Sequence, residues 1–433
     1  MTQQQAFAGR PVYVVDGART PFLKAKGKPG PFTAANLAVA AGRRLLDRQP
    51  FSPDLFDEVI MGCVMPGPEE ANIARTIALR LNCKERVPAW TVQRNCASGM
   101  QALDCAAHNI ASGRSDLILA GGVEAMSHAP VLLNEKMVRW LADWMRARSF
   151  GARMKALSQL RGGHFKPVIG LLCGLTDHTV GLNMGQTAEN LAYRFKISRE
   201  RMDAFAVQSH QRLARAQDEN FLNEIEVIYD TRGHFYDADD GLRRDSDVAK
   251  LAKLKPVFDR HYGMVTAANS AQVTDGAALL VLASEAAVEK HKLPVMGRIV
   301  DAAWAGLNPA EMGLGPAHAM AQILQHRKMK PSDIDYWEIN EAFATQVLAC
   351  REAWMDSAYC KKELGWRKAV GEIDNERLNV DGGGVSLGHP VGASGARIVL
   401  HLLSVLERTK SKQGIASLCI GGGQGGAMLL ERP

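Results

Sequence analysis

The chain repeats one strand-helix order in its two parts, and this repeat limits the folds that it can adopt. Residues 90–122 have the hydrophobic pattern of a strand, a helix and a second strand, with the triplet Ala-Ser-Gly at 97–99. The same triplet occurs at 393–395, within residues 388–430, which we interpret as a helix followed by a single strand. Two further pairs of segments resemble each other: 12–18 and 297–303, and 117–122 and 417–423. We therefore expect two similar halves.

Short β-rich runs alternate with helix-length amphipathic runs from the N-terminus onward, with helices expected near 34–47 and 72–81. This alternation indicates an α/β fold with mostly buried strands. Because 433 residues exceed one average domain of roughly 100–200 residues, we expect more than one packed unit. The expected division is residues 1–127 with 256–290 as the first half, 128–255 as an insertion, and 291–433 as the second half.

Cysteine usage and the absence of targeting signals favour a cytoplasmic protein. The eight cysteines form no C-x-x-C pair and show no regular spacing, which is typical of reduced thiols. The opening segment, MTQQQAFAGRPVYVV, lacks the apolar centre of a signal peptide, and no run of 18 apolar residues predicts a membrane span. We expect neither export nor a transmembrane segment.

Cys96 stands where a predicted strand turns into a predicted helix at residues 96–112. A helix N-terminus carries unpaired N–H groups and partial positive charge, which favour thiolate over thiol. The alternative is a small buried apolar residue, which is the commoner state of a free cysteine. The position at such a turn, which resembles a nucleophile elbow, makes Cys96 a candidate nucleophile.

Three more candidates stand in glycine-rich or strand-end segments. His389 lies among small residues at 382–397 and could act as a general base for Cys96, or it could be a surface-loop histidine. Cys419 precedes three glycines and could move a proton to or from C2 of an acyl chain, or it could be a core thiol. Asn340 follows a predicted strand and could hold a catalytic water, or it could cap a helix.

Four linked motifs resemble those of the thiolase family: NCASGMQAL at 95–103, NEAFA at 340–344, GGGVSLGHPVGASGAR at 382–397 and CIGGGQGGAML at 419–429. Further matches extend the resemblance over about residues 10–433. The resemblance implies a thiolase fold with two similar βαβ-rich halves in five α-β-α-β-α layers, and an inserted loop domain that binds coenzyme A. It also implies a homodimer or tetramer, coenzyme A and acyl-CoA as substrates, and no permanently bound cofactor or metal.

By position, the resemblance also implies a role for each candidate. Cys96 would carry the acyl group, His389 would activate it, and Cys419 would be the acid and base for C2 or for the incoming thiol. Asn340 would hold a water that forms one oxyanion hole with His389, and the backbone N–H groups of Cys96 and Gly421 would form the other. Acyl transfer to Cys96 would release acetyl-CoA, and a second coenzyme A would then take the acyl group.

The expected residues for binding of substrate and coenzyme A are Met184, Ser270, Ala271 and Phe343. Two positions depart from the commoner family pattern. Ala271 replaces a serine that touches pantetheine in many thiolases, and Asn183 replaces a histidine before Met184. The long insertion and the segments 252–258 and 422–428 look more like the thiolase β-subunit of fatty-acid-oxidation complexes. We therefore predict a 3-ketoacyl-CoA thiolase of fatty acid β-oxidation, with a hydratase/dehydrogenase subunit as a further partner.

The insertion also holds the basic excess of the chain. Residues 136–166 contain eight basic residues and one acidic residue, whereas the whole chain has a net charge of +6. Aromatic and aliphatic residues recur among them at helical spacing: Met137, Trp140, Leu141, Trp144, Phe150, Met154 and Leu157. This composition suits a peripheral membrane contact through 136–175, a partner subunit or the phosphates of coenzyme A. The alternative is a solvated helical hairpin, and the apolar face disfavours nucleic acid.

Two other classes of protein compete with a thiolase. A decarboxylating ketoacyl synthase shares the fold and a cysteine at the top of a helix, but typically has histidines where Cys419 stands. A catalytically silent lipid-binding or scaffold subunit would not need the reactive residues. The joint presence of Cys96, His389, Asn340 and Cys419 favours an active thiolase.

Overall fold

The computed structural model describes residues 9–433, and one hydrogen-bonded sheet path runs through both halves of the chain. The strand order is β4-β3-β5-β12-β1 in the first half and β14-β15-β16-β13 in the second. A short antiparallel pairing of β1 with β13 joins them. The strands are β1 (Tyr13–Arg19), β3 (Glu58–Gly62), β4 (Ala89–Val92), β5 (Leu117–Ala125), β12 (Thr274–Ala283), β13 (Gly297–Gly306), β14 (Tyr336–Ile339), β15 (Gln413–Ile420) and β16 (Gln424–Glu431).

The two halves use the same order of elements. The first strand of each half, β1 or β13, pairs antiparallel with the last, β12 or β16. The last strand pairs with β5 or β15, which in turn lies parallel to β3 or β14. Helix α3 (Ser98–Ala111) leads into β5, and helix α15 (Val391–Thr409) leads into β15. The repeat of two similar halves that the sequence predicts is therefore confirmed.

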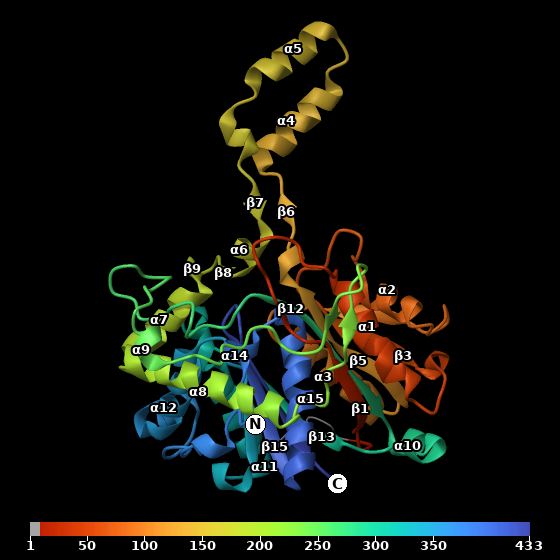
Figure 1. Cartoon of the computed structure of the whole chain (residues 1–433), viewed down its shortest axis with the longest axis vertical. Helices are drawn as coiled ribbons and strands as arrows, with labels where there is room; N and C mark the ends of the chain where they lie inside the picture. The colour runs from red at the N-terminus through yellow and green to blue at the C-terminus, as the bar shows by residue number, and fades with distance from the viewer. Residues whose placement is uncertain (1–8) are drawn as a thin grey trace.

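Three apolar clusters fill the spaces between five layers of helix and sheet (Figure 1). Helices α3 and α15 form the middle layer. The outer layers contain α1 (Ala34–Asp47) and α2 (Ile73–Arg80) on the first half, and α11 (Gly315–Arg327) and α12 (Ala344–Met355) on the second. Side chains of strand β12 alternate between the two faces of the sheet, so the strand contributes to two apolar clusters. Those that pack toward α1 are Ala277, Leu279 and Val281, and those that pack toward the middle layer are Ala278, Leu280 and Leu282.

The helices expected near 34–47 and 72–81 are confirmed as α1 and α2. The interpretation of residues 414–430 as one strand is wrong, because β15 and β16 form an antiparallel hairpin. Gly422 and Gly423 have φ values of 91° and 75° at its turn, a left-handed conformation that glycine adopts without a steric cost. The three-part division of the chain stays a prediction, and residues 1–8 of the segment expected to lack an export signal lie outside the described residues.

Helices α3 and α15 cross in direct backbone contact. A Cβ atom added to Gly99 would lie 2.8 Å from the carbonyl oxygen of Gly392, and one added to Gly395 would lie 2.6 Å from the amide nitrogen of Met100. Real Cβ atoms do not approach so closely, so the crossing requires glycine at these positions.

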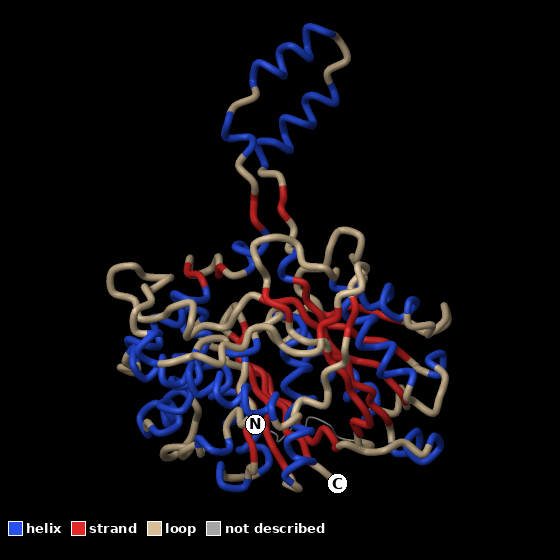
Figure 2. Tube along the Cα trace, viewed as in Figure 1, coloured by secondary structure: helices blue, strands red, loops and turns tan. Residues whose placement is uncertain are grey.

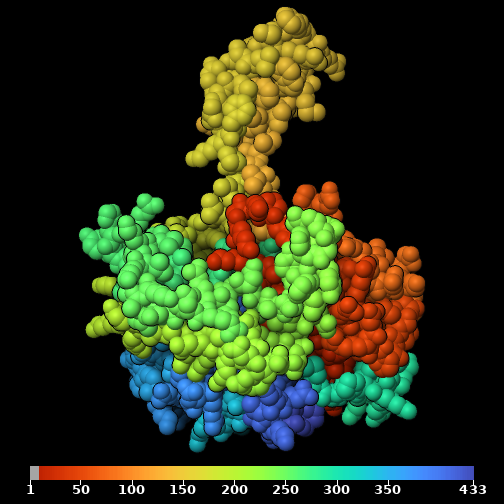
Figure 3. All heavy atoms as spheres, viewed as in Figure 1, coloured from red at the N-terminus to blue at the C-terminus, as the bar shows by residue number. Residues whose placement is uncertain are grey.

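Part of the insertion forms an arm that projects from the body (Figure 1, Figure 2). Two short strands, β6 (Val131–Leu132) and β7 (Val168–Ile169), form its stalk, and α4 (Glu135–Arg146) and α5 (Phe150–Gln159) form its tip. The space-filling view shows a narrow stalk below this tip (Figure 3). Trp140 and Trp144 stack with ring centroids 5.7 Å apart, which confirms the predicted helical spacing.

The arm also contains η3 (Gly162–Phe165), between α5 and β7. The remaining elements complete the body: β2 (Leu23–Lys24), η1 (Pro53–Leu55), η2 (Met126–His128), α6 (Gly170–Gly174), β8 (Thr176–Asp177), β9 (Leu182–Asn183), α7 (Met184–Arg194), α8 (Arg199–Asp218), β10 (Ile228–Tyr229), β11 (Phe235–Tyr236), α9 (Val248–Leu251), α10 (Glu285–His291), η4 (Pro309–Leu314), η5 (Pro331–Asp333), α13 (Ser357–Glu363), η6 (Asn375–Arg377) and α14 (Gly384–Leu387). Among residues 9–433, no helix has the length and apolar character needed to cross a membrane.

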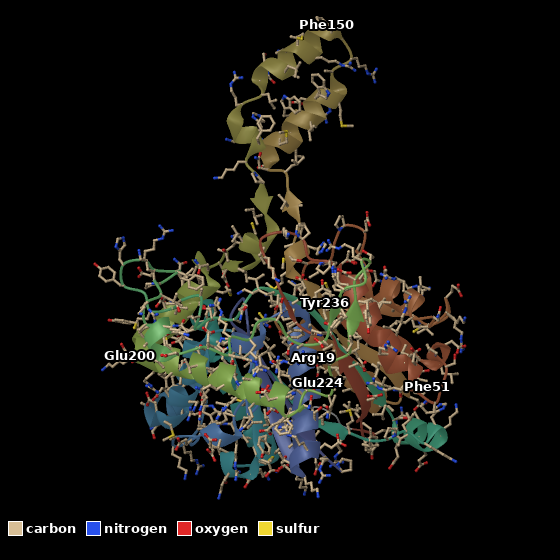
Figure 4. The ribbon with its side chains drawn as sticks, in the orientation of Figure 1. Arg19, Phe51, Phe150, Glu200, Glu224 and Tyr236 are labelled. Carbon is tan, nitrogen blue, oxygen red and sulfur yellow. The ribbon has the colours of Figure 1, made fainter. Side chains whose placement is uncertain are left out.

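Buried charges tie the insertion to both halves. Arg19 at the end of β1 bonds Asp239 at 2.7 Å and Glu224 at 3.2 Å, and Figure 4 shows Arg19 beside Glu224. His401 of α15 lies 2.9 Å from Glu224 and 3.3 Å from Asp381. Burial alone would lower the pKa of His401, but these carboxylates raise it to about 10. Burial would raise the pKa of Glu224, but His401 and Arg19 lower it to about 2.

We expect Gly99→Ala to lower the free energy of unfolding by about 1–3 kcal/mol, because its Cβ would force α3 and α15 apart. Gly151→Ala is the matched control, since Gly151 lies in α5 with open space around it, and alanine there should stabilise by up to about 1 kcal/mol. Urea unfolding of the two variants measures both effects. Equal unfolding free energies would contradict the close crossing.

Stability should fall between pH 6.5 and about 10. His401 gives its full contribution below its unfolded pKa of 6.5 and loses it as the pH rises through about 10. Glu224 contributes fully above its unfolded pKa of 4.5 and loses this as the pH falls through about 2. We expect His401→Gln to cost about 3–5 kcal/mol and to flatten the alkaline decline, measured by thermal unfolding across pH. The exposed His326→Gln control should leave that decline unchanged.

Candidate active site

Cys96 lies in a tight turn between β4 and α3. Asn95 has a φ of 43°, a left-handed conformation that asparagine tolerates better than most residues. The Ser98 hydroxyl donates to the Asn95 carbonyl oxygen at 2.7 Å and accepts the Arg94 N–H at 2.9 Å, which closes the turn. The helix itself starts at Ser98, two residues later than the sequence suggested. The turn leaves Cys96 half-buried, just before the N-terminus of α3.

Hydrogen bonds hold both the backbone and the side chain of His389 in place. Its backbone N–H donates to the carbonyl oxygen of Gln272 at 3.1 Å. Its Nδ1 lies 2.6 Å from the Ser394 hydroxyl, whose oxygen is also 3.1 Å from the Pro390 carbonyl oxygen. Because the hydroxyl has one proton and the carbonyl can only accept, Ser394 donates to Pro390 and accepts from Nδ1–H. This arrangement leaves Nε2 as the basic nitrogen.

The imidazole of His389 is uncharged at neutral pH. Burial, together with a smaller charge repulsion from Arg397, lowers its pKa to about 4. A neutral imidazole has a free lone pair and can accept a proton from a thiol. His389 therefore has the protonation state that a general base needs.

Asn340 lies beside His389, directly after β14. Its amide nitrogen is 3.4 Å from Nδ1 and 3.5 Å from Nε2 of His389, and its own backbone N–H donates to Ser417 at 2.9 Å. The side chain is fully buried, and its Oδ1 has no hydrogen-bond partner among the described residues. A buried amide oxygen without a partner is a suitable acceptor for a water molecule.

Cys419 and Gly421 reach Cys96 from the second half. The Asn95 side chain donates to the Gly421 carbonyl oxygen at 2.8 Å, which holds the two turns together. Burial raises the pKa of Cys419 well above its usual value, and the neighbouring Cys96 raises it further. The four predicted catalytic side chains therefore come from strand ends and helix starts that meet at one edge of the sheet.

The backbone at the start of α3 favours the Cys96 thiolate, as expected, but burial opposes it more strongly. Burial raises the pKa of Cys96, although hydrogen bonds from the backbone N–H groups of Gly421 and of Cys96 itself lower it in part. The desolvation of the thiolate therefore exceeds the stabilisation that the backbone provides. Cys96 rests as a thiol and needs a base.

The predicted binding residues occupy two places. Met184 begins α7 and lies next to Gly421, where a Cβ added to the glycine would be 3.4 Å from the Met184 sulfur. Ala271 donates its N–H to Ala342 at 2.9 Å, so it runs beside the segment that follows Asn340. Phe343 in that segment packs edge-on against a second aromatic ring, and Ser270 donates its hydroxyl to Thr266 at 2.7 Å. The roles of all four in binding stay predictions.

Three residues at the site were missed in the sequence. Asn95 supplies the left-handed turn, Ser394 orients His389, and Glu124 accepts backbone N–H groups from both halves. Ser394 belongs to the repeated triplet, which is the only signal that could have marked it. Asn183, the departure noted above, caps α7 by accepting the Gln186 N–H at 3.0 Å. Among residues 9–433, no three His, Cys, Asp or Glu side chains are grouped to hold a metal.

Comparisons with known proteins agree with this geometry. Residues 12–286 match the thiolase N-terminal domain, and residues 293–432 match the thiolase C-terminal domain. A 3-ketoacyl-CoA thiolase of Yersinia pestis (strain Pestoides F) is 35% identical over 427 residues, covering 98% of this chain and 97% of that protein.

Solved structures match as well. Human mitochondrial 3-ketoacyl-CoA thiolase in complex with CoA gives a TM-score of 0.83 at 36% identity, over 98% of each chain. The Bacillus anthracis acetyl-CoA acetyltransferase gives a TM-score of 0.84 at 35% identity, over 99% of this chain and 100% of that one. The predicted thiolase fold is confirmed, and the chain belongs to the thiolase family.

Proposed function

We propose that this protein is a 3-ketoacyl-CoA thiolase, an acyltransferase that cleaves 3-ketoacyl-CoA with coenzyme A in fatty acid β-oxidation. The observation that carries the proposal is the convergence of two thiols, one neutral histidine and one unpartnered amide oxygen at the same sheet edge. The names of the relatives, 3-ketoacyl-CoA thiolases, support the substrate class.

In the first half-reaction, His389 takes the thiol proton of Cys96, and the Cys96 sulfur attacks C3 of the substrate. The C2–C3 bond then breaks, the acyl group stays on Cys96, and the electron pair on C2 takes a proton from Cys419. Acetyl-CoA leaves. The raised pKa of Cys419 suits it to donate this proton, because the thiol form predominates until a carbanion develops nearby.

In the second half-reaction, the Cys419 thiolate takes the proton of a coenzyme A thiol, and the coenzyme sulfur attacks the carbonyl carbon on Cys96. The shortened acyl-CoA leaves, and His389 returns its proton to Cys96. The backbone N–H groups of Cys96 and Gly421 would hold the oxyanion on one carbonyl, and a water on Asn340 with His389 would hold the other. No external oxidant, reductant or resident cofactor is needed for this sequence.

The edge of the sheet in the first half, at β4, is suited to bind a second copy of this chain. Strand β4 ends the sheet path, so one side of it carries no strand among the described residues. Nearby, Arg94 Nη1 and Gln101 Oε1 are buried without a hydrogen-bond partner among residues 9–433, and Asp104 Oδ1 has only a 3.7 Å ion-pair contact with His108 there. A homodimer through this edge would supply the missing donors and acceptors. Tetramer formation and a hydratase/dehydrogenase partner are further parts of the proposal that rest on family resemblance.

The arm is proposed to dock on an anionic membrane surface, with the protein in the cytoplasm. Met145 and Phe150 at its tip are 82% and 81% exposed, which is unusual for apolar side chains that have no partner. Arg146, Arg148 and Lys155 surround them and are exposed. Apolar insertion together with positive charge is the composition of interfacial helices.

The catalytic proposal predicts that Cys96→Ala lowers turnover of 3-ketoacyl-CoA by at least about 10³-fold, because the acyl carrier is lost. Cys105→Ala is the matched control, a half-buried cysteine on the adjacent helix that should keep turnover. The assay follows acetyl-CoA release with and without free coenzyme A, and intact mass detects the acyl adduct. Wild-type protein that releases no acetyl-CoA would refute the thiolase, and decarboxylation instead would identify a ketoacyl synthase.

The docking proposal predicts that changing Arg146, Arg148 and Lys155 to glutamine weakens binding to anionic vesicles by about 100-fold, at about 1 kcal/mol per basic residue. The matched control removes three exposed charges from the body, Lys361, Arg367 and Lys368. Vesicle co-sedimentation at low and high salt measures the difference. Equal loss in both variants, or equal binding of the wild type to neutral vesicles, would count against a charged docking arm.

A further inference from the structure

Glu124 is a buried carboxylate at the active site that the reaction described above does not use. It is the next-to-last residue of β5 and is fully buried. Its Oε2 accepts the backbone N–H groups of Val64 at 2.9 Å and Gly392 at 3.1 Å, and its Oε1 accepts that of Met65 at 3.0 Å. The thiol of Cys63 lies 3.7 Å from Oε1. All of its hydrogen-bonding capacity is therefore directed at main chain and one thiol.

These donors come from both halves of the molecule. Val64 and Met65 follow β3 in the first half, whereas Gly392 is the second residue of α15 in the second half, three residues after His389. A Cβ added to Gly392 would lie 2.7 Å from the Glu124 carboxylate, so the helix start rests directly on it. A change in the length or hydrogen bonding of the Glu124 side chain must therefore move the start of α15.

The charge of Glu124 also acts on Cys96. Burial raises the pKa of Cys96, the N–H of Gly421 opposes this, and the negative charge of Glu124 raises it further. The titratable groups that face Glu124 are Cys63, after β3, and Cys96, before α3, and Glu70 adds a weaker effect on Cys63. Helix α15 contributes only its backbone at this point. Burial raises the pKa of Glu124 itself to about 7, so the carboxylate is charged in mildly alkaline solution.

We propose that Glu124 is a positioning residue for acyl transfer, which holds the start of α15, and with it His389, against the first half. This inference rests on the proposed function. Besides this positioning effect on His389, the negative charge of Glu124 would act on Cys96, and the two effects can be tested apart.

Two variants of Glu124 separate these effects. Glu124→Gln removes the charge and one acceptor, and Glu124→Asp keeps the charge but shortens the reach. We expect the pH midpoint of Cys96 alkylation by iodoacetamide, followed by mass spectrometry, to move down by at least about 0.5 pH units in Glu124→Gln and to stay in place in Glu124→Asp. Both variants should lower kcat by about 10-fold or more, because His389 is displaced, with KM changed less than about threefold.

The control is Glu189→Gln. Glu189 also accepts backbone N–H groups, from Met264 at 2.9 Å and Val265 at 2.9 Å, but it is not among the charges that act on Cys96. This variant should leave the alkylation midpoint unchanged. If Glu124→Gln leaves it unchanged too, the charge effect is refuted, and if Glu124→Asp retains wild-type kcat, the positioning effect is refuted.

Circular dichroism of each variant checks folding. If Glu124→Gln does not fold, Glu124→Asp alone decides the positioning effect. The charge effect is then decided by Glu124→Asp against wild type, since a moved alkylation midpoint in a variant that keeps the charge would refute it. Alkylation needs no thiolysis, so failure of the proposed function would appear separately, as wild-type protein that releases no acetyl-CoA.

Discussion

The backbone contact between α3 and α15 is the constraint on which the rest of the site depends. Helices separated by ordinary side chains lie about 8–10 Å apart, but Gly99, Gly392 and Gly395 allow these two to cross in direct contact. Each helix follows a turn that holds one reactive residue, Cys96 before α3 and His389 before α15. The closeness of the two turns therefore follows from the closeness of the helices. The two similar halves therefore form a single site, because each half supplies the start of one helix.

Burial lowers the pKa of both His389 and His401, but their charged neighbours leave the two histidines in opposite charge states. No carboxylate among residues 9–433 offsets the burial of His389, and Arg397 disfavours its charge further, so it is neutral, with a pKa of about 4. His401, which lies within α15, contacts Glu224 and Asp381 and stays protonated, with a pKa of about 10. The first histidine is thus ready to accept a proton, whereas the second fixes the helix by charge. Cys96 is also neutral at rest, so charge develops only during attack, when the backbone donors can stabilise it.

The sequence predicted the parts of this structure that depend on periodicity and repeated motifs. The bounds of α1 match the expectation, and the α/β halves were visible in segments such as 12–18 and 297–303. The prediction of one strand at 414–430 failed because the flanking apolar pattern continues through the glycines, although Gly422 and Gly423 reverse the chain. The net charge state of Cys96 could not be predicted from its place at a helix start, since burial depends on how distant segments pack. Glu124 was missed for the same reason, because one of the backbone N–H groups that it accepts is 268 residues away in the chain.

The insertion connects the arm to the active site through a short length of chain. After the stalk strand β7, only α6 and the small hairpin of β8 and β9 separate the arm from Met184, which touches Gly421. On the other side, the stalk leaves β5 just after Glu124, with only η2 between them. One end of the arm is therefore linked along the chain to Met184, beside Gly421. The other end is linked to Glu124, which contacts Gly392. If the tip docks on a surface as proposed, these two segments are the links along the chain between the docked tip and the site. The proposed docking surface thus lies outside the catalytic body, although the chain links it to both Met184 and Glu124 (Figure 1).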